Sequence, residues 1–256
     1  MNSNSNGLIS EQEIIHGLNN KRVGDISNHL REILRCLFGP LDDNSYVLCT
    51  KVDDANKTDF IIKLDAHERF VSMKQGRAES VHDEEIDSFC KYLKDNGISS
   101  KTIETIRLYH FGDGTVDGSG STRMGYAEVM VWLGERIVDA NSELNFSREF
   151  VFKTVERCVF LGAKNDNIAA DCIYFGDRNY GFVATKKQIY KHLGKRDFAF
   201  YDNLHIGPLL LRPHSRYAGR PIVSVRNRRR CVLYWPRLGS DIEFIATRYD
   251  YESCHK

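Results

Sequence analysis

Acidic residues are missing from a long C-terminal stretch of this sequence. Between residues 203 and 240 the 256-residue chain has no Asp, Glu or Lys, although its formal net charge is only +1. The same stretch holds arginines at Arg212, Arg216, Arg220, Arg226, Arg228, Arg229, Arg230 and Arg237. Such an asymmetry predicts a polyanionic partner such as nucleic acid. Two alternatives stay open: the arginines pair with acidic residues of the N-terminal half, or they form a basic edge that deters strand pairing.

Several other features are absent, and each absence excludes a class of protein. No run of 18 apolar residues exists, and the polar N-terminus has no apolar core of a signal peptide, so we expect neither a membrane span nor export. Seven cysteines occur without a CxxC pair, which favours the reduced thiols of a cytoplasmic protein over a zinc site or a disulfide framework. The pattern GxxxxGK[ST] is missing, which excludes a P-loop NTPase.

The spacing of apolar residues predicts an α/β protein. We expect a disordered lead over 1–20, a core over 21–111 and a helical plus β elaboration over 112–256. In the core, the predicted order is a helix (24–38), three strands (45–52, 58–64, 69–74), a helix (82–95) and a strand within 103–111. In the elaboration we expect helices at 124–140, 146–161 and 186–193, a hairpin at 171–175 and 180–184, and strands within 204–249.

A serine and a lysine share one face of the third predicted strand. Residues alternate between the two faces of a strand, so Ser72 and Lys74 point to the same side. If the second and third strands form a hairpin, Asp59 lies beside Lys74 at one end of the sheet. Glu84, placed in the first turn of the following helix, and Glu32, on the preceding one, are candidate further carboxylates. Carboxylates and a lysine at one sheet edge suit metal-assisted cleavage of a phosphodiester.

The pattern Asp59…Ser72-x-Lys74 on this order of elements resembles the PD-(D/E)xK nucleases over about residues 24–111. Two positions depart from the family pattern: Thr58 replaces the usual proline, and Ser72 replaces the second carboxylate. A branch of the type II restriction endonucleases has the same Ser-x-Lys, with the missing Glu supplied by the next helix. The resemblance implies a Mg²⁺-dependent DNA endonuclease in which Asp59 and Glu84, or Glu85 as fallback, bind the metal.

The resemblance also implies roles for the remaining candidates. Lys74 would position or activate the attacking water, and Ser72 would support the site. Glu32 would complete the ligand shell of the metal. Double-stranded DNA is the implied partner, and cutting both strands at a symmetric site favours a homodimer. The expected DNA contacts are Arg123, Arg212, Arg216, Arg220, Arg226, Arg228, Arg229, Arg230, Lys186 and Lys187.

A glycine-rich stretch, HFGDGTVDGSGSTRMG over 110–125, allows two interpretations. It is either a surface turn or linker, or a loop that brings Thr122 and Arg123 to a DNA phosphate. The function also has alternatives: a repair or mobile-element nuclease of the same fold, a DNA-binding protein whose nuclease core is inactive because of Ser72, or an unrelated small-molecule enzyme.

Overall fold

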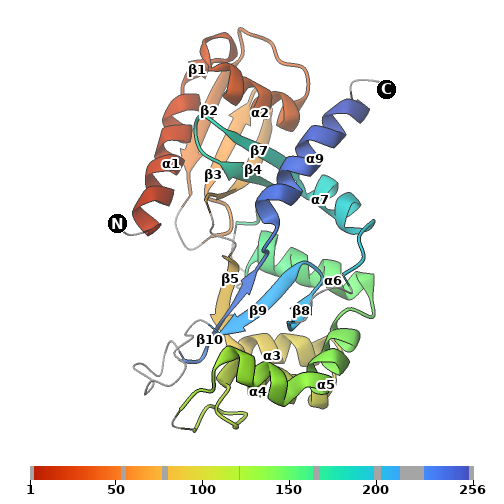
Figure 1. The fold of residues 1–256 in the computed structure, drawn as a ribbon. Coiled ribbons are helices and arrows are strands. Elements are labelled where there is room, and N and C mark those ends of the chain that lie inside the picture. Colours follow the sequence, from red (N-terminus) through yellow and green to blue (C-terminus); the bar gives the residue numbers. More distant parts are fainter. Residues whose placement is uncertain are drawn as a thin grey trace. The chain divides into compact units, whose positions relative to one another are not determined.

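The chain folds into two compact units (Figure 1). The structure, a computed structural model, describes residues 3–52, 56–76, 80–120, 122–163, 168–198, 203–213 and 228–253. The first unit comprises Met1–Glu79, Val159–Arg196 and Arg237–Lys256, and the second comprises Ser80–Cys158 and Asp197–Pro236. This division differs from the predicted one after residue 111, because the chain leaves the first unit near residue 79 and returns to it twice.

A six-stranded mixed sheet forms the centre of the first unit. Its order is β1-β2-β3-β4-β6-β7. The strands are β1 (Lys21–Arg22), β2 (Tyr46–Lys51), β3 (Phe60–Leu64), β4 (His67–Lys74), β6 (Cys172–Gly176) and β7 (Gly181–Thr185). All neighbours are antiparallel except β4 and β6, which are parallel. A parallel pair needs a long crossover connection, and the connection from β4 to β6 contains the first segment of the second unit.

Helices cover both faces of this sheet. The helical segments of the first unit are α1 (Ser3–Leu18), the 3₁₀ turn η1 (Val23–Asp25), α2 (Asn28–Phe38), α7 (Lys186–Leu193) and α9 (Leu238–Ser253). Helix α2 ends at Gly39, whose φ of +83° is a conformation that favours glycine. Helix α9 packs on β6 and β7, with Gly239 against the ring of Phe175.

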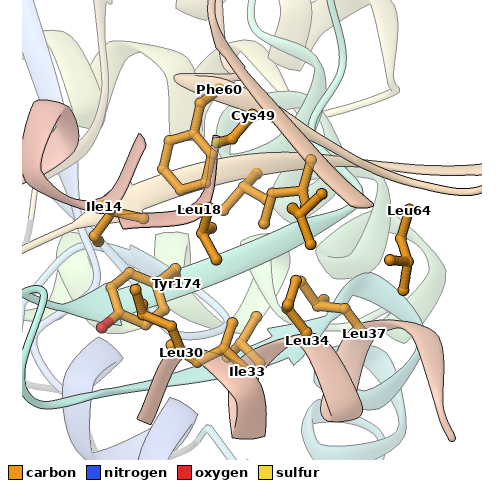
Figure 2. Close-up of a cluster of buried hydrophobic side chains, with 14 of the residues drawn as sticks. Ile14, Leu18, Leu30, Ile33, Leu34, Leu37, Cys49, Phe60, Leu64 and Tyr174 are labelled. Carbon is orange, nitrogen blue, oxygen red and sulfur yellow. The ribbon is translucent and has the colours of Figure 1, made fainter. Parts of the chain in front are cut away.

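One face of the sheet and helices α1 and α2 enclose a continuous apolar core (Figure 2). Leu30, Leu34 and Leu37 recur at helical spacing on α2 and are buried there. Phe60 and Ile62 alternate along β3 toward the same core, so Asp59 and Ile61 belong to the opposite face. The alternation therefore decides which side chains remain for chemistry on that opposite face.

The disordered lead predicted over residues 1–20 is wrong, because this segment contains helix α1. Ile14 and Leu18 join the core, and Gly17 permits close approach to Leu30, whose Cδ1 would lie 2.7 Å from an added Cβ. The polar start of the chain hid this helix, since residues 2–7 are all Asn, Ser or Gly.

The second unit has its own antiparallel sheet, ordered β5-β10-β9-β8. Its strands are β5 (Ser80–Glu85), β8 (His205–Ile206), β9 (Leu209–Pro213) and β10 (Arg230–Tyr234). Its helices are α3 (Ile86–Asp95), α4 (Ser100–Phe111), α5 (Tyr126–Leu144) and α6 (Arg148–Val155), and α6 continues into the π-helix η2 (Glu156–Leu161) at the unit boundary.

The predicted α/β class is confirmed, and so are the 171–184 hairpin and the 186–193 helix. Three local predictions are wrong. Residues 80–85 form β5 before α3 begins, 103–111 is helical in α4, and the end of the stretch 204–249 forms α9. The predicted strands within 204–249 lie partly outside the described residues, because 214–227 is not among them. No helix in the described parts of the chain is long and apolar enough to cross a membrane.

Truncating Leu18 tests the role assigned to α1. Leu18 is 0% exposed in the core, so Leu18→Ala removes buried methyl groups and leaves a cavity. We expect the free energy of unfolding to fall by about 3 kcal/mol, measured by urea denaturation. The exposed Glu13 on the same helix supplies the control Glu13→Ala, which should change it by about 0.5 kcal/mol or less. Equal effects of the two variants would contradict the packing of α1.

Candidate active site

The antiparallel pairing of β3 with β4 brings Asp59 beside Lys74. Phe60 pairs with Val71, and the Asp59 N–H donates to the Val71 carbonyl oxygen at 2.9 Å. Asp59 therefore stands just before β3 at the sheet end where β4 finishes with Lys74. Thr58, at the position of the usual proline, is buried, and its hydroxyl donates to the Ile168 carbonyl oxygen at 3.1 Å. That hydrogen bond holds the residue that directly precedes Asp59.

Asp59, Ser72 and Lys74 form one hydrogen-bonded cluster. Lys74 Nζ lies 3.7 Å from Asp59 Oδ2 and donates to Ser72 Oγ at 3.1 Å. Ser72 Oγ donates to Asp59 Oδ2 at 3.4 Å, and the Met73 N–H donates to the same oxygen at 2.6 Å. Ser72 is 1% exposed, whereas the side chains of Asp59 and Lys74 are 25% and 24% exposed. The buried Ser72 thus bridges Asp59 and Lys74 by hydrogen bonds, and both charged side chains are partly exposed to solvent.

Lys74 has a further neighbour that limits its motion. Its Nζ also donates to the Met73 carbonyl oxygen at 2.9 Å. The ammonium group is held by Ser72 Oγ, Met73 O and the Asp59 carboxylate, so its position is defined before any ligand arrives. Phe175, which pairs with Lys74 across β4 and β6, packs against the start of α9.

Glu84 does not join this cluster through any described contact. It lies on β5 in the second unit, where Arg157 donates to its two carboxylate oxygens at 2.5 and 2.7 Å. His82 Nε2 lies 3.0 Å from Glu84 Oε1, and the ring of Tyr92 lies 4.5 Å from the Arg157 guanidinium carbon. Glu84 is 6% exposed. The placement in a helix start was wrong because residues 80–85 pair with β10, which sequence spacing alone does not reveal.

The surroundings of Glu84 make it a buried charged anchor. Burial raises the pKa of its carboxyl group, but the hydrogen bonds from Arg157 and His82 and their charges outweigh burial and bring the pKa to about 2. The fallback Glu85 is exposed at the end of the same strand.

Glu32 occupies the outer, exposed side of α2, where it pairs with Arg35. Helix α2 packs on the face opposite to Ser72 and Lys74, since Met73 and Phe60 share its core. No described contact joins Glu32 to Asp59. Its predicted role in the site stays a prediction.

Mg²⁺ binds proteins through one or two carboxylates together with water and phosphate. All three described hydrogen bonds and ion contacts of the Asp59 carboxylate reach Oδ2, so its Oδ1 fits a metal ligand. Within the described ranges, however, no group of three or more His, Cys, Asp or Glu side chains could hold a metal ion. In the described cluster Asp59 is the one carboxylate, and water and phosphate would have to complete the shell of a bound Mg²⁺.

Three of the arginines predicted to contact DNA are instead paired with carboxylates of the second unit. Arg228 pairs with Asp113, Arg229 with Asp87, and Arg230 with Asp83 at 2.9 Å. Arg212 stacks 5.1 Å from the centre of the Tyr234 ring. Arg216, Arg220 and Arg226 lie outside the described residues. For Arg228, Arg229 and Arg230 the structure agrees with one of the two alternatives, pairing with acidic residues from earlier in the chain.

The glycine-rich stretch is a folded loop that closes α4. Arg123 donates to the carbonyl oxygens of Tyr109 and Phe111 at 3.1 and 2.7 Å, so it caps the helix. Asp113 accepts from the Thr115 N–H at 2.9 Å, and Arg228 binds both Asp113 and the Gly120 carbonyl oxygen. These contacts explain the loop without a phosphate, so no observation supports the predicted role of Arg123.

Lys186 and Lys187 begin α7 in the first unit. Lys186 lies 5.8 Å from the centre of the Phe160 ring and 5.9 Å from that of Tyr190. Lys187 is exposed.

Comparison with protein-family models, with curated proteins and with solved structures found no match.

Neutralising Glu84 tests its role as an anchor. In the unfolded chain it titrates near 4.5 and in the native protein near 2, so its contribution is complete above pH 4.5 and is lost as the pH falls toward 2. We expect Glu84→Gln to lower the free energy of unfolding at pH 7 by about 3 kcal/mol, because Arg157 loses its partner. The difference from the unsubstituted protein should shrink between pH 4.5 and pH 2.

The control for this experiment is Glu85→Gln, which removes the same charge from an exposed neighbour. We expect it to leave the free energy of unfolding within about 0.5 kcal/mol at pH 7. A pH-independent difference between Glu84→Gln and the unsubstituted protein, measured by urea denaturation from pH 7 to pH 2, would contradict the assigned pKa.

Proposed function

We propose that this protein is a Mg²⁺-dependent DNA endonuclease of the PD-(D/E)xK type. The observation that carries the proposal is the cluster of Asp59, Ser72 and Lys74 at the end of the β3–β4 hairpin. The topology also supports it. A helix precedes three antiparallel strands, and a parallel strand lies next to the third. In this interpretation the first segment of the second unit, Ser80–Cys158, is inserted between the third strand and the parallel one.

The chemistry assigns a task to each member of the cluster. Asp59 would hold the metal through Oδ1, and bound Mg²⁺ supplies positive charge to the scissile phosphate and lowers the pKa of a bound water. Lys74 carries the only described ammonium group at this edge that contacts Asp59, so it would donate to a phosphate oxygen or orient the attacking water. Ser72 would hold the Lys74 and Asp59 side chains in place through its hydrogen bonds to both.

An inactive DNA-binding protein is the second candidate, and Glu84 favours it. With Glu84 committed to Arg157, no described residue supplies the second carboxylate that the family pattern uses. Salt-sensitive binding of duplex DNA without cleavage in Mg²⁺ would select this candidate.

The substrate pattern separates restriction-type cleavage from repair or mobile-element cleavage. Discrete fragments from a long mixed-sequence duplex indicate a specific site, and such a site favours a homodimer by its two-fold symmetry. Cutting only at ends or branched structures indicates repair.

Substitutions in the cluster test the nuclease directly. We expect Asp59→Asn and Lys74→Ala to reduce the cleavage rate of duplex DNA in Mg²⁺ by about 100-fold or more. The first removes the negative charge that would hold the metal, and the second removes the positive charge beside the reacting phosphate. The readout is the fragment yield on a gel, with thermal melting of each variant to confirm that it folds.

Two residues of the same sheet supply matched controls. Asp65 lies in the β3–β4 turn at the other end of the hairpin, and Lys63 is an exposed lysine of β3 that pairs with Glu68. Asp65→Asn and Lys63→Ala remove the same charges and should keep cleavage within about twofold. A loss of cleavage in the controls equal to that in the cluster variants would contradict the assigned site.

A further inference from the structure

The turn between β6 and β7 lies at the same edge of the sheet as the cluster of Asp59, Ser72 and Lys74. Strands β4 and β6 are parallel, so both end at this edge, and Lys74 pairs with Phe175. Three positions further along the chain, the turn contains Arg178. The Cα atoms of Lys74 and Arg178 are therefore about 16 Å apart at most, because neighbouring strands are about 5 Å apart and each residue adds at most about 3.6 Å.

Hydrogen bonds to the main chain define the shape of this turn. The Asp177 N–H donates to the Tyr180 carbonyl oxygen at 2.8 Å. Asp177 Oδ1 accepts from the N–H groups of Asn179 and Tyr180 at 2.8 and 3.1 Å. The hydroxyl group of the buried Tyr174 donates to the Asp177 carbonyl oxygen. The Asp177 carboxylate thus binds the backbone of the turn, and a core residue holds the turn in place.

Two glycines allow the strands to approach each other closely next to the turn. Gly176 pairs with Gly181 across β6 and β7 and has a φ of +146°. A Cβ added to Gly176 would lie 2.3 Å from the Gly181 Cα atom, and one added to Gly181 would lie 2.3 Å from the Tyr174 hydroxyl oxygen. The backbone of the turn is therefore defined before any ligand binds.

Arg178 and Tyr180 are the exposed large side chains of this turn. Within the described ranges, no ion pair or hydrogen bond engages the Arg178 guanidinium group. Tyr180 is 63% exposed, with its ring centre 5.2 Å from that of Phe182 and its hydroxyl oxygen 3.5 Å from Glu243 Oε1. The hydrogen bonds that shape the turn use neither side chain. Both side chains are therefore available to a partner.

The arginines at the end of the acid-free stretch have a different arrangement. Arg228, Arg229 and Arg230 each pair with a carboxylate of the second unit. A phosphate would have to compete with those carboxylates for the guanidinium groups. Arg178 has no described carboxylate to give up, so its charge can neutralise a phosphate at lower cost.

We propose that Arg178 binds a backbone phosphate of the DNA strand that is cut, and that Tyr180 packs on the sugar–phosphate backbone beside it. The choice of DNA rests on the proposed function, because the turn shares its sheet edge with Lys74. One strand of duplex DNA carries a charge every 3.4 Å or so along its axis, so a distance of about 16 Å or less reaches a phosphate within several nucleotides of the scissile one. Such contacts fix the position of the strand and carry no information on base sequence.

Binding is measured by fluorescence anisotropy with a short DNA duplex in Ca²⁺ instead of Mg²⁺, at several salt concentrations. We expect Arg178→Gln to bind about tenfold more weakly, with a salt slope shallower by about 0.9, because one phosphate contact is lost. Arg178→Lys keeps the charge and should keep the salt slope, with an affinity within about threefold. An Arg178→Gln protein with unchanged affinity and salt slope would overturn the proposal.

The opposite corner of the same sheet supplies a matched control. Arg22 and Tyr46 are exposed there, on β1 and β2, and Arg22 Nε donates to the Tyr46 hydroxyl oxygen at 3.0 Å. The control variant carries Arg22→Gln and Tyr46→Leu. The turn variant carries Arg178→Gln and Tyr180→Leu. We expect the turn variant to bind the duplex at least about tenfold more weakly, the control to stay within about twofold, and both to keep their melting temperature. Equal losses of affinity in the two variants would overturn the proposal.

The same binding assay on Asp59→Asn keeps this proposal distinct from the nuclease. We expect that protein to bind DNA and to lose affinity when Arg178→Gln is added. A protein that binds DNA through Arg178 but does not cleave it would end the nuclease proposal and support the role of the turn. An active nuclease in which Arg178→Gln changes neither affinity nor KM would overturn the role of the turn alone.

Discussion

The register between β3 and β4 is the constraint on which the proposed chemistry depends. Pairing of Phe60 with Val71 places the Asp59 carboxylate against the Met73 N–H and within 3.7 Å of Lys74 Nζ. A slip of one residue would turn every side chain of the strand to the other face. The core opposes such a slip, because Phe60, Ile62 and Met73 are buried against α1 and α2. Packing on one face of the sheet thus holds the polar cluster on the other.

The alternation of apolar and polar residues was sufficient to predict this hairpin and its polar cluster. It did not predict the contacts with segments that are distant in the sequence. Alternation along residues 58–74 correctly brought Asp59, Ser72 and Lys74 together. Glu84 was misplaced because β5 pairs with β10, and Asp83 and Arg230 of those strands are 147 positions apart. Helix α9 was predicted as strand because its packing partners also lie far away in the sequence. Its buried face, with Ile242 and Ile245, is defined by its packing in the first unit.

Charge in this molecule is organised by pairing rather than by local composition. A stretch free of acidic residues looked like a surface for polyanions, yet Arg228, Arg229 and Arg230 within it pair with Asp113, Asp87 and Asp83 from earlier in the chain. Each of these pairs joins two segments that are far apart in the sequence.

The most direct measurement is the conversion of a supercoiled plasmid by the unsubstituted protein, with Mg²⁺ and with a chelator. The account predicts linear or nicked product in Mg²⁺ alone, with cleaved ends that carry phosphate and hydroxyl groups, as hydrolysis requires. A plasmid that remains supercoiled in Mg²⁺ while the protein is bound to it would contradict the account. It would leave a DNA-binding protein whose Asp59–Lys74 pair stabilises the hairpin without cleaving DNA.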